Sequence, residues 1–462
     1  NWKLKERAGK FDGMKILEAR AAVVEELKSK GLIEKVEENY THQVPVDYRS
    51  GDYIENLILP NWFIKVDDPK KSLKKPAYEA VKKGTIKIYP KWREKTYLRW
   101  MESMRDWPIS RQTIWGIRIP VWYKVDRNKE NLWISSKTYM GPANAPLNRG
   151  DVTLEELTKD LQKLVASSGP DKPDYVVSVE KPNDGNEWLP ETDTFDTWFS
   201  SGQWPLVTLG YPNSKDFKYF YPTSVLETGW EIVTRWVSRM IMFGYYITGK
   251  PPFTDVYIHG HVSAIDGRKM SKSLGNVINP DDYLRQFGAD VLRMGLISGT
   301  AGGKDFNFPQ DKIVAYRNFA NKLWNIARFI DINIGGKDIP PYSPTLNGLT
   351  KEDKEIIKKL ESTIKQVDNN LMKFRFSQAA EIIYQFVWHE LADKYIENCK
   401  LKIENSKIKP EEKRASITVL LHCYLTSIKL LHPFMPFITE EIWSKLPHKE
   451  ETPLITSSWP KG

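Results

Sequence analysis

The stretch Val256-Tyr-Ile-His-Gly-His-Val-Ser-Ala-Ile-Asp-Gly-Arg-Lys-Met-Ser-Lys-Ser-Leu-Gly-Asn276 decides the fold class of this chain. Its first three residues, Val256–Ile258, predict a short buried strand, and Pro280 opens a helical pattern downstream. Similar apolar runs alternate with helical patterns from Trp62 to about Phe306. The sequence therefore predicts an α/β core.

Between this strand and helix lies a loop that carries three cations and two hydroxyl groups: Arg268, Lys269, Lys272, Ser271 and Ser273. Such a loop suits a polyanionic phosphate chain, because lysine is a compact point charge on a long stem and can follow charge that builds up on a leaving group. A solvated basic turn is the alternative interpretation, and for an arbitrary lysine-rich loop it is the commoner one.

A second strand and helix predict a nucleotide site. Ser224–Gly229 has the pattern of a strand that ends in glycine, and Glu231–Ile247 that of the helix that follows. Gly229 and Glu231 would then lie where a strand ends and a helix begins, the place where α/β sheets bind nucleotides. A carboxylate there can accept hydrogen bonds from a ribose diol. Taken alone, however, an acid in the first turn such as Glu231 more often only complements the helix dipole.

The remaining segments divide the chain. Residues 16 to 30 predict an amphipathic helix closed by Gly31, and extended pieces are expected at 43–46 and 53–59. Residues 126–190 have the polar composition of an insertion with one helix, Leu154–Val165. From Asp311 onward only helical periodicity occurs, interrupted by a linker at Gly335–Gly348. The C-terminal part is therefore expected to be a helical bundle, with four residues on one buried face: Phe319, Leu323, Ile326 and Ile330.

Composition narrows the class of protein. The 462 residues suffice for two to four domains, and a net charge of +9 favours a polyanionic partner. Two cysteines, Cys399 and Cys423, exclude a disulfide scaffold and suit a reducing cytoplasm. The longest apolar run, Met240–Ile247, is too short to cross a membrane.

Five residues, Lys269–Ser273, resemble the KMSKS signature of the class I aminoacyl-tRNA synthetases. Asp196–Ser201 and Arg111–Pro120 are similar to segments of the valyl branch of that family and, less closely, of the isoleucyl branch. Asn318–Asn325 resembles a valyl-specific junction, and Leu431–Trp443 a signature of the anticodon-binding bundle. The resemblance covers essentially the whole chain and implies valine, ATP with Mg²⁺, and tRNA(Val) as substrates.

The resemblance also implies a fold and domain order. We expect an incomplete Rossmann-like nucleotide-binding core followed by an all-α bundle. Residues 1–58 would form the tail of an editing insertion, 59–306 the C-terminal half of the catalytic domain, and 307–462 the anticodon-binding bundle.

Site residues carry over by motif. Lys269, Lys272, Ser271 and Ser273 would form the catalytic loop. ATP would be bound by six residues: Gly229, Glu231, His259, Gly260, Met270 and Asn276. Trp115 and Trp198 would wall the aliphatic pocket, although tryptophans without this context are usually core. Two positions depart from the family pattern: Glu231 replaces the usual aspartate, and Ile117 replaces a histidine.

Two expected motifs are absent. The family's His-x-Gly-His signature does not occur, since Ile258-His-Gly-His261 has the wrong spacing and position. We therefore expect the chain alone not to form an adenylate, and a missing N-terminal half to supply that motif in cis or as a separate chain. Asp47-Tyr-Arg-Ser50 stands where relatives often carry a cysteine pair, so the sequence predicts no zinc. An isoleucyl enzyme and a tRNA-binding module without catalysis remain the alternatives.

Overall fold

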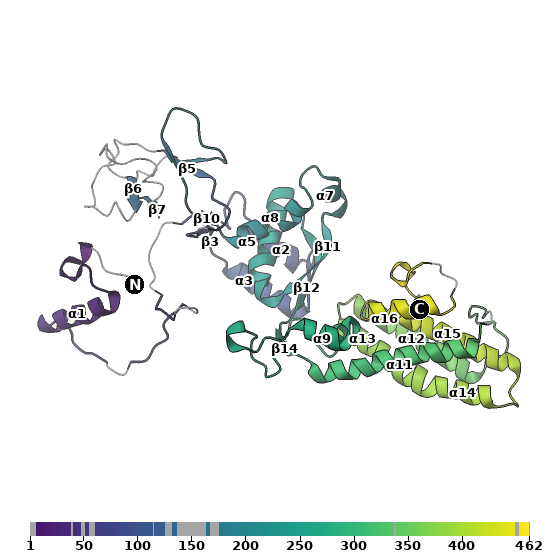
Figure 1. Cartoon of the computed structure of the whole chain (residues 1–462). Helices are drawn as coiled ribbons and strands as arrows, with labels where there is room; N and C mark the ends of the chain where they lie inside the picture. The colour runs from purple at the N-terminus through teal and green to yellow at the C-terminus, as the bar shows by residue number, and fades with distance from the viewer. Residues whose placement is uncertain are drawn as a thin grey trace. The chain divides into compact units, whose positions relative to one another are not determined.

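A computed structural model describes residues 6–37, 40–47, 51–54, 61–113, 115–124, 132–135, 163–166, 175–336, 339–448 and 452–461. The chain divides into two compact units, residues 1–59 and 60–462. The first contains a 3₁₀ helix, η1 (Glu6–Phe11), and the helix α1 (Ile16–Ser29) (Figure 1). Gly31 ends α1 with a φ of +64°, as the sequence predicts. Of the two extended pieces, one isolated bridge remains, Val46 to Tyr53, and residues 55–60 lie outside the described part.

The second unit is built around a parallel sheet in the order β11-β12-β2. These strands span Thr223–Gly229, Phe253–His259 and Lys87–Tyr89. Three helices pack against the sheet: α2 (Lys74–Lys82), α3 (Lys91–Ser103) and α8 (Ser238–Thr248) (Figure 1). Apolar residues of the strands and helices share one buried core. The α/β prediction is confirmed, and so are the strands predicted at Val256–Ile258 and Ser224–Gly229.

Other short strands form smaller sheets. The pairs are β1·β3, β4·β10, β6·β7 and β13·β14, and β8-β5-β9 form a three-stranded sheet. Their bounds are β1 Phe63–Ile64, β3 Trp107–Pro108, β4 Ser110–Arg111, β5 Val121–Lys124, β6 Leu132–Ser135, β7 Lys163–Ala166, β8 Tyr175–Val177, β9 Trp188–Pro190, β10 Thr194–Phe195, β13 Val262–Ser263 and β14 Phe306–Asn307. The intervening helices are α5 Thr197–Ser201, α6 Trp204–Thr208, α7 Lys215–Phe220, η4 Lys272–Leu274, α9 Pro280–Phe287 and α10 Ala289–Ile297.

Two sequence predictions need correction here. The helix expected at Glu231–Ile247 begins as a 3₁₀ turn, η2 (Trp230–Ile232), continues as a π-helix, η3 (Val233–Val237), and becomes α-helical only in α8. The side chains of Ser238 and Arg239 both donate to the carbonyl of Thr234, at 2.7 and 2.9 Å, which accompanies the wider turn.

The helix expected at Leu154–Val165 is also wrong at its end. Residues 163–166 form the strand β7, which pairs antiparallel with β6. Residues 151–162 lie outside the described part, so the rest of that prediction is not tested.

The C-terminal part is all helical, as predicted (Figure 1). Its elements are α11 Gln310–Ile334, α12 Lys351–Leu371, α13 Phe376–Gln385, the π-helix η5 Phe386–Ile396, α14 Glu397–Glu404, α15 Pro410–Leu431, α16 Pro436–Lys445 and the 3₁₀ turn η6 Leu454–Thr456. The four residues expected on one face of α11 are all buried, and the core that contains them extends into α10. Cys399 and Cys423 are buried free thiols inside this bundle.

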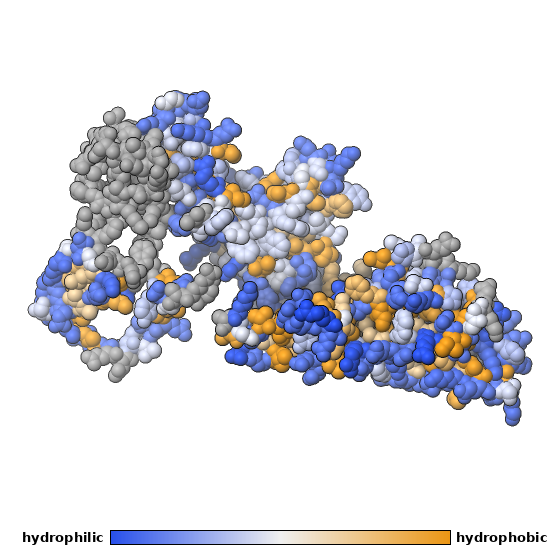
Figure 2. Space-filling view, viewed as in Figure 1, coloured by the Kyte–Doolittle hydropathy of each residue, from blue (hydrophilic) through white to orange (hydrophobic). Residues whose placement is uncertain are grey.

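The surface of the bundle is mixed. Figure 2 shows hydrophilic residues with hydrophobic patches between them over its visible face. Among the described helices, none is both long and apolar enough to cross a membrane.

Candidate functional site

Two parallel strands bring the predicted nucleotide-binding residues together. β11 and β12 pair in a register that sets Gly229 directly opposite His259, so both strands end at the same edge of the sheet. Gly260 follows at once, and Glu231 lies in the first turn after β11. The sequence predicts a strand end at Gly229 and another at His259, but it does not show that the two are adjacent. The register of the two strands makes them neighbours. This edge is the one at which α/β sheets bind ligands.

Gly260 is required by a close backbone approach. A Cβ at this position would lie 1.7 Å from the carbonyl oxygen of Lys304 and 2.7 Å from the amide nitrogen of Asp305. Main-chain atoms cannot move aside as a flexible side chain can, so no larger residue fits here without a shift of the 300–305 loop. The loop therefore lies directly against the strand ends. We call these strand ends the nucleotide edge, after the residues predicted there to bind ATP: Gly229, Glu231, His259 and Gly260.

Two carboxylate–imidazole pairs occupy the edge itself. Oε2 of Glu231 lies 2.6 Å from Nε2 of His261, and Oε1 of Glu227 lies 3.2 Å from Nε2 of His259. All four side chains are partly exposed to solvent. Within the described part of the chain, Oε1 of Glu231 has no hydrogen-bond partner, which leaves it available to a hydroxyl group.

Three residues of this edge were not predicted from the sequence. Asp305 accepts hydrogen bonds from the indole of Trp230 at 2.7 Å and from the backbone N–H of His261 at 2.8 Å. These bonds, the backbone one foremost, hold the pKa of Asp305 below its usual value. The Arg93 guanidinium lies 4.8 Å from the Trp230 ring and donates to the carbonyl of Gly303. Burial lowers the pKa of Arg93. No local motif marks these residues, because they meet only through the fold.

The lysine loop is closed by hydrogen bonds between the Asn276 side chain and the loop backbone. The side chain of Asn276 accepts from the N–H of Ser271 at 2.9 Å and donates to the carbonyl of Lys269 at 3.1 Å. Gly275 ends the short η4 turn with a φ of +64°. In this structure the asparagine therefore ties the two ends of the loop together.

The lysines of the loop point to solvent. Lys269 and Lys272 are exposed, and among the described residues neither forms an ion pair. Arg268, in contrast, is neutralised by Asp266 at 2.7 Å. No hydrogen bond of the described residues joins either lysine to Gly229 or Glu231. Two unpaired ammonium groups remain for an anionic ligand.

The segments that carry Trp115 and Trp198 are neighbours. β4 and β10 pair, with Arg111 opposite Thr194, and the backbone N–H of Asp196 donates to Ile109 at 2.6 Å. Trp115 is 90% exposed, whereas Trp198 is half-buried against the sheet core. Among the described aromatic pairs, none joins the two indoles. The structure thus brings the segments together without closing a pocket between these rings.

Metal ligands are sparse. Among the described residues, no three His, Cys, Asp or Glu side chains gather in a way that could hold a metal ion. Residues 48–50 of the segment considered for zinc lie outside the described part.

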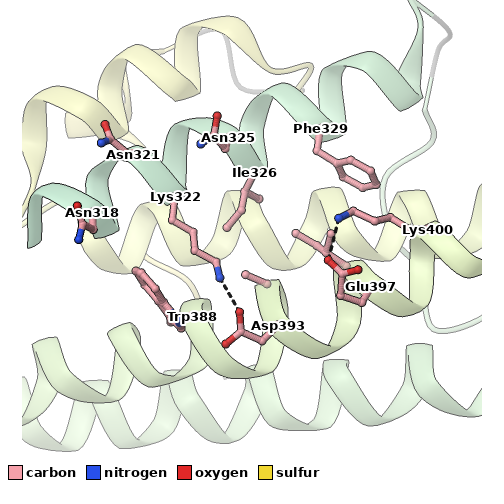
Figure 3. A pocket seen from close by; sticks show the side chains of 12 residues that line it. Asn318, Asn321, Lys322, Asn325, Ile326, Phe329, Trp388, Asp393, Glu397 and Lys400 are labelled. Carbon is pink, nitrogen blue, oxygen red and sulfur yellow. Dashed lines mark hydrogen bonds and ion pairs between the residues drawn. The ribbon is translucent and has the colours of Figure 1, made fainter. Parts of the chain in front are cut away.

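A pocket lies in the helical bundle (Figure 3). Three exposed asparagines on one side of α11 line it, Asn318, Asn321 and Asn325, together with the half-buried ring of Phe329. Figure 3 shows these residues along one helix, facing side chains from η5 and α14.

Charged and aromatic side chains from α11, η5 and α14 also line the pocket. Lys322 pairs with Asp393 at 2.5 Å and lies 4.5 Å from the centroid of the Trp388 ring. The hydrogen bond from Lys322 holds the pKa of Asp393 below its usual value. Lys400 pairs with Glu397 at 2.7 Å (Figure 3). Amides, half-buried aromatic rings and cations together are the groups that bind an unstacked nucleobase and its phosphate.

Solved structures share the fold. A Mycobacterium tuberculosis methionyl-tRNA synthetase in complex with methionyl-adenylate superposes with a TM-score of 0.60 at 16% identity, covering 87% of this chain and 65% of its own. An Agrobacterium radiobacter LeuRS in complex with tRNA and LeuAMS gives 0.54 at 24% identity, covering 78% and 42%. At these identities the likeness shows the fold alone.

Curated relatives match the whole chain. The valine–tRNA ligase of Staphylococcus carnosus is 37% identical over 99% of this chain and 47% of its own length. Those of Pseudothermotoga lettingae and Clostridium tetani are each 39% identical, over 99% and 100% of this chain and 47% of their own. The chain therefore spans about half the length of the curated relatives it matches.

Two family models match the chain, one from within the first unit to residue 309 and one from residue 353 to the C-terminus. Residues 353–462 match the anticodon-binding domain of tRNA ligase. Residues 15–309 match the tRNA synthetases of class I (I, L, M and V), and since this match covers more than half of the chain, the protein belongs to that family.

Proposed function

We propose that this chain forms part of an ATP-dependent ligase that joins valine to tRNA(Val). The observation that carries the proposal is the edge where Gly229, His259 and Gly260 meet, followed directly by an exposed lysine loop. Identity of 37–39% to valine–tRNA ligases along the whole chain supports valine rather than isoleucine. The site residues follow from the motifs they match. Its substrates and its two buried free thiols suit the cytoplasm.

The reaction has two steps. The carboxylate of valine attacks the α-phosphorus of ATP, an acyl–phosphate bond forms, and pyrophosphate leaves with the electron pair of the broken P–O bond. A terminal hydroxyl of tRNA then attacks the acyl carbon of valyl-adenylate and AMP departs. Mg²⁺ enters with ATP as part of the substrate.

Each part of the edge has a task in the first step. Lys269 and Lys272 would neutralise charge that develops on the departing pyrophosphate, the point at which preorganised charge accelerates a reaction most. Gly229 and Gly260 would lie beside the adenosine at the strand ends, and the space that a side chain at Gly260 would need is filled by the Lys304 carbonyl. Oε1 of Glu231 would accept a hydrogen bond from the ribose, with Oε2 already fixed by His261.

The other half of the active site would come from the part of the relatives that this chain does not match. β11 is an edge strand in the order β11-β12-β2, so within the described residues one side of its backbone is unpaired. An unpaired seven-residue edge is a template for a further strand. We propose that the missing half, in cis or as a separate chain, completes the sheet there and brings the His-x-Gly-His motif. Residues 1–58, 59–306 and 307–462 would then be the editing tail, the catalytic half and the anticodon-binding bundle.

The bundle pocket is the proposed contact for an unpaired base of the tRNA. Phe329 offers a ring face for stacking, and Asn321 and Asn325 offer amide groups that, among the described residues, have no hydrogen-bond partner. α11 lies outside both matched ranges, so this assignment rests on the geometry of the pocket.

Pyrophosphate exchange tests the proposal. The chain is combined with its own N-terminal half, or with that of the Pseudothermotoga lettingae ligase, and ATP–pyrophosphate exchange is measured with valine, isoleucine and threonine. We expect exchange that depends on valine and is weaker with both analogues. If exchange is faster with isoleucine, isoleucine rather than valine is the substrate. If the chain binds tRNA but supports exchange with no amino acid, it is a binding module without catalysis.

A further inference from the structure

Phe374 has a backbone conformation that side chains rarely adopt. Its φ is +54°, and among the described residues it is the one non-glycine with a positive φ. It lies in the turn between α12 and α13, where its N–H donates to Leu371 and that of Arg375 donates to Asn370. Glycine is the usual residue at such a position, because any Cβ there crowds the backbone. This chain has a phenylalanine at that position, so the contacts of its ring are of interest.

The ring of Phe374 packs on the nucleotide-binding sheet. Its centroid lies 4.7 Å from that of Tyr89 on β2 and 5.9 Å from that of Tyr257 on β12. These two tyrosines are directly opposite each other in the sheet. Phe376 adds an edge-on contact to Tyr257, with centroids 5.0 Å apart. A turn of the bundle is thus seated on two strands, and Tyr257 is two residues from His259.

The same turn also holds the loop that borders the nucleotide edge. The hydroxyl of Ser377 accepts a hydrogen bond from the N–H of Gly299 at 2.7 Å. Further along the loop, a Cβ at Gly302 would lie 3.6 Å from Cε2 of Tyr257, which is ordinary van der Waals contact. Tyr257 is therefore enclosed by Phe374 and Phe376 from the bundle and by this loop.

The far end of the loop reaches the site. The Lys304 carbonyl abuts Gly260, and Asp305 holds Trp230 and the backbone of His261. His261 in turn pairs with Glu231. An unbroken series of contacts therefore runs from the turn of the bundle to Glu231, the carboxylate proposed to bind the ribose.

We propose that Phe374 is a positioning residue: its ring, held by the strained turn, fixes Tyr257 and the 299–305 loop, and through them the His259–His261 edge. The nucleotide edge is then well ordered only while the bundle packs on the sheet. A ligand that binds the bundle therefore changes the affinity of the edge for its own ligand, and the reverse also holds. The identity of those ligands rests on the proposed function, whereas the positioning does not.

Hydrogen exchange on the full chain separates ring from backbone. Phe374→Ala removes the ring and keeps the unfavourable φ, Phe374→Gly removes the ring and relieves the backbone, and Phe374→Tyr keeps the ring. We expect both truncations to raise exchange at least tenfold in residues 253–260 and 299–305, with α15 unchanged and the tyrosine variant like the parent. Phe437→Ala is the matched control, a 67% exposed phenylalanine of the bundle.

Two outcomes would overturn the proposal. If residues 253–260 and 299–305 exchange as slowly in Phe374→Gly as in the parent, the ring has no positioning role. If Phe374→Ala accelerates exchange equally in α15, the residue stabilises the whole unit rather than the edge.

Ligand binding supplies the second readout. The probe is Mg·ATP, and the protein is the complemented enzyme, that is, the chain combined with its N-terminal half. Phe374→Ala should weaken ATP binding about tenfold and remove any effect of tRNA on ATP affinity. The affinity for tRNA itself should stay within twofold of the parent. Parallel loss of both affinities would contradict positioning. If the parent binds neither ligand, the proposed function fails, and the exchange experiment still decides the role of Phe374.

Discussion

At the scale of single residues, Lys272 offers the sharpest test of the chemistry. It is exposed and, within the described part, unpaired, so its substitution leaves folded contacts intact. In the complemented enzyme we expect Lys272→Ala to slow single-turnover adenylate formation by about 10²–10³, the usual effect of removing one preorganised charge, with tRNA affinity nearly unchanged. Lys272→Arg should rescue only in part, because a planar fork does not reproduce a compact point charge.

Lys181, another exposed lysine outside the loop, is the matched control, and its replacement by alanine should leave the rate unchanged. An intact adenylation rate in Lys272→Ala, together with tenfold weaker tRNA binding, would make the loop an RNA contact instead.

Gly260 tests the close approach at the sheet edge. Gly260→Ala must displace the Lys304 carbonyl, which lies 1.7 Å from the new Cβ, so we expect a loss of about 1–3 kcal/mol in stability and weaker ATP binding. Gly302→Ala, in the same loop, meets nothing closer than 3.5 Å and should be tolerated. Urea unfolding of both variants makes the comparison, and equal stabilities would contradict the contact.

Whether a site residue could be predicted from the sequence depends on how far along the chain its partners lie. The loop with Lys269 and Lys272 and the strand end at Gly229 are visible as local patterns. Asp305 and Arg93 are not, because each meets Trp230 or its neighbours only after the chain has folded. No spacing rule connects residues separated by seventy positions or more.

At the scale of elements, the π-helix η3 shows a limit of periodicity. Apolar spacing identified a helical segment but could not show that its first turns are 3₁₀ and π, because those depend on how side chains such as Arg239 bond the carbonyl of Thr234. The sheet order β11-β12-β2 was equally out of reach, since it follows from long-range pairing.

Asp353 is the buried anchor of the bundle helices. It has no exposed surface and accepts hydrogen bonds from Tyr395 at 2.6 Å, Ser416 at 2.9 Å and the N–H of Thr350 at 2.8 Å, with Lys402 at 3.3 Å. Burial by itself raises the pKa of Asp353, but these bonds, led by that from Tyr395, outweigh it and leave the pKa below its usual value.

Removing this carboxylate should be costly. Asp353→Ala removes the buried counter-charge of Lys402 and an acceptor that two hydroxyl groups share, so we expect a loss of about 3–5 kcal/mol in the unfolding free energy of the bundle, measured by urea denaturation. Glu352→Ala is the control: this neighbour is half-exposed and 3.8 Å from the same lysine, and it should cost at most about 1 kcal/mol. Similar losses for the two variants would contradict the assigned role.

The pH dependence of this contribution has a definite sign. Because the folded pKa of Asp353 is lowered, its stabilisation is present above the pKa of the unfolded state, near 3.8, and is lost as the pH falls through the folded value. The difference in stability between the parent and Asp353→Asn should therefore shrink as the pH is lowered from 6 to about 3. A difference independent of pH would show that ionisation of Asp353 does not contribute.

At the scale of the whole molecule, the order of an α/β core before an all-α bundle was predictable, because each half has its own hydrophobic period. The seating of the bundle on the sheet was not. It depends on Phe374 in a conformation that favours glycine, so neither local propensity nor the apolar pattern marks it as a contact.

The proposed binding of tRNA would use the bundle. With a net charge of +9 the chain should bind tRNA mainly through phosphates, and affinity should fall steeply as salt rises because counterions are released. Each phosphate contact adds a slope of about −0.9 in log K against log salt, so two contacts give about a tenfold loss between 50 and 200 mM salt. Fluorescence anisotropy of labelled tRNA(Val) measures the slope, and an affinity independent of salt would contradict the prediction.

The pocket on α11 should contribute differently. Phe329→Ala removes a stacking face, which is typically worth about 1–3 kcal/mol per base, yet it removes no charge. We therefore expect weaker binding at every salt concentration with the slope unchanged, whereas Ile332→Ala, an exposed residue of the same helix, should change neither. A smaller slope in Phe329→Ala would mean that the substitution had displaced phosphate contacts such as those available to Lys400, which lies 5.8 Å from the ring. Unchanged affinity would place the unpaired base elsewhere on the bundle.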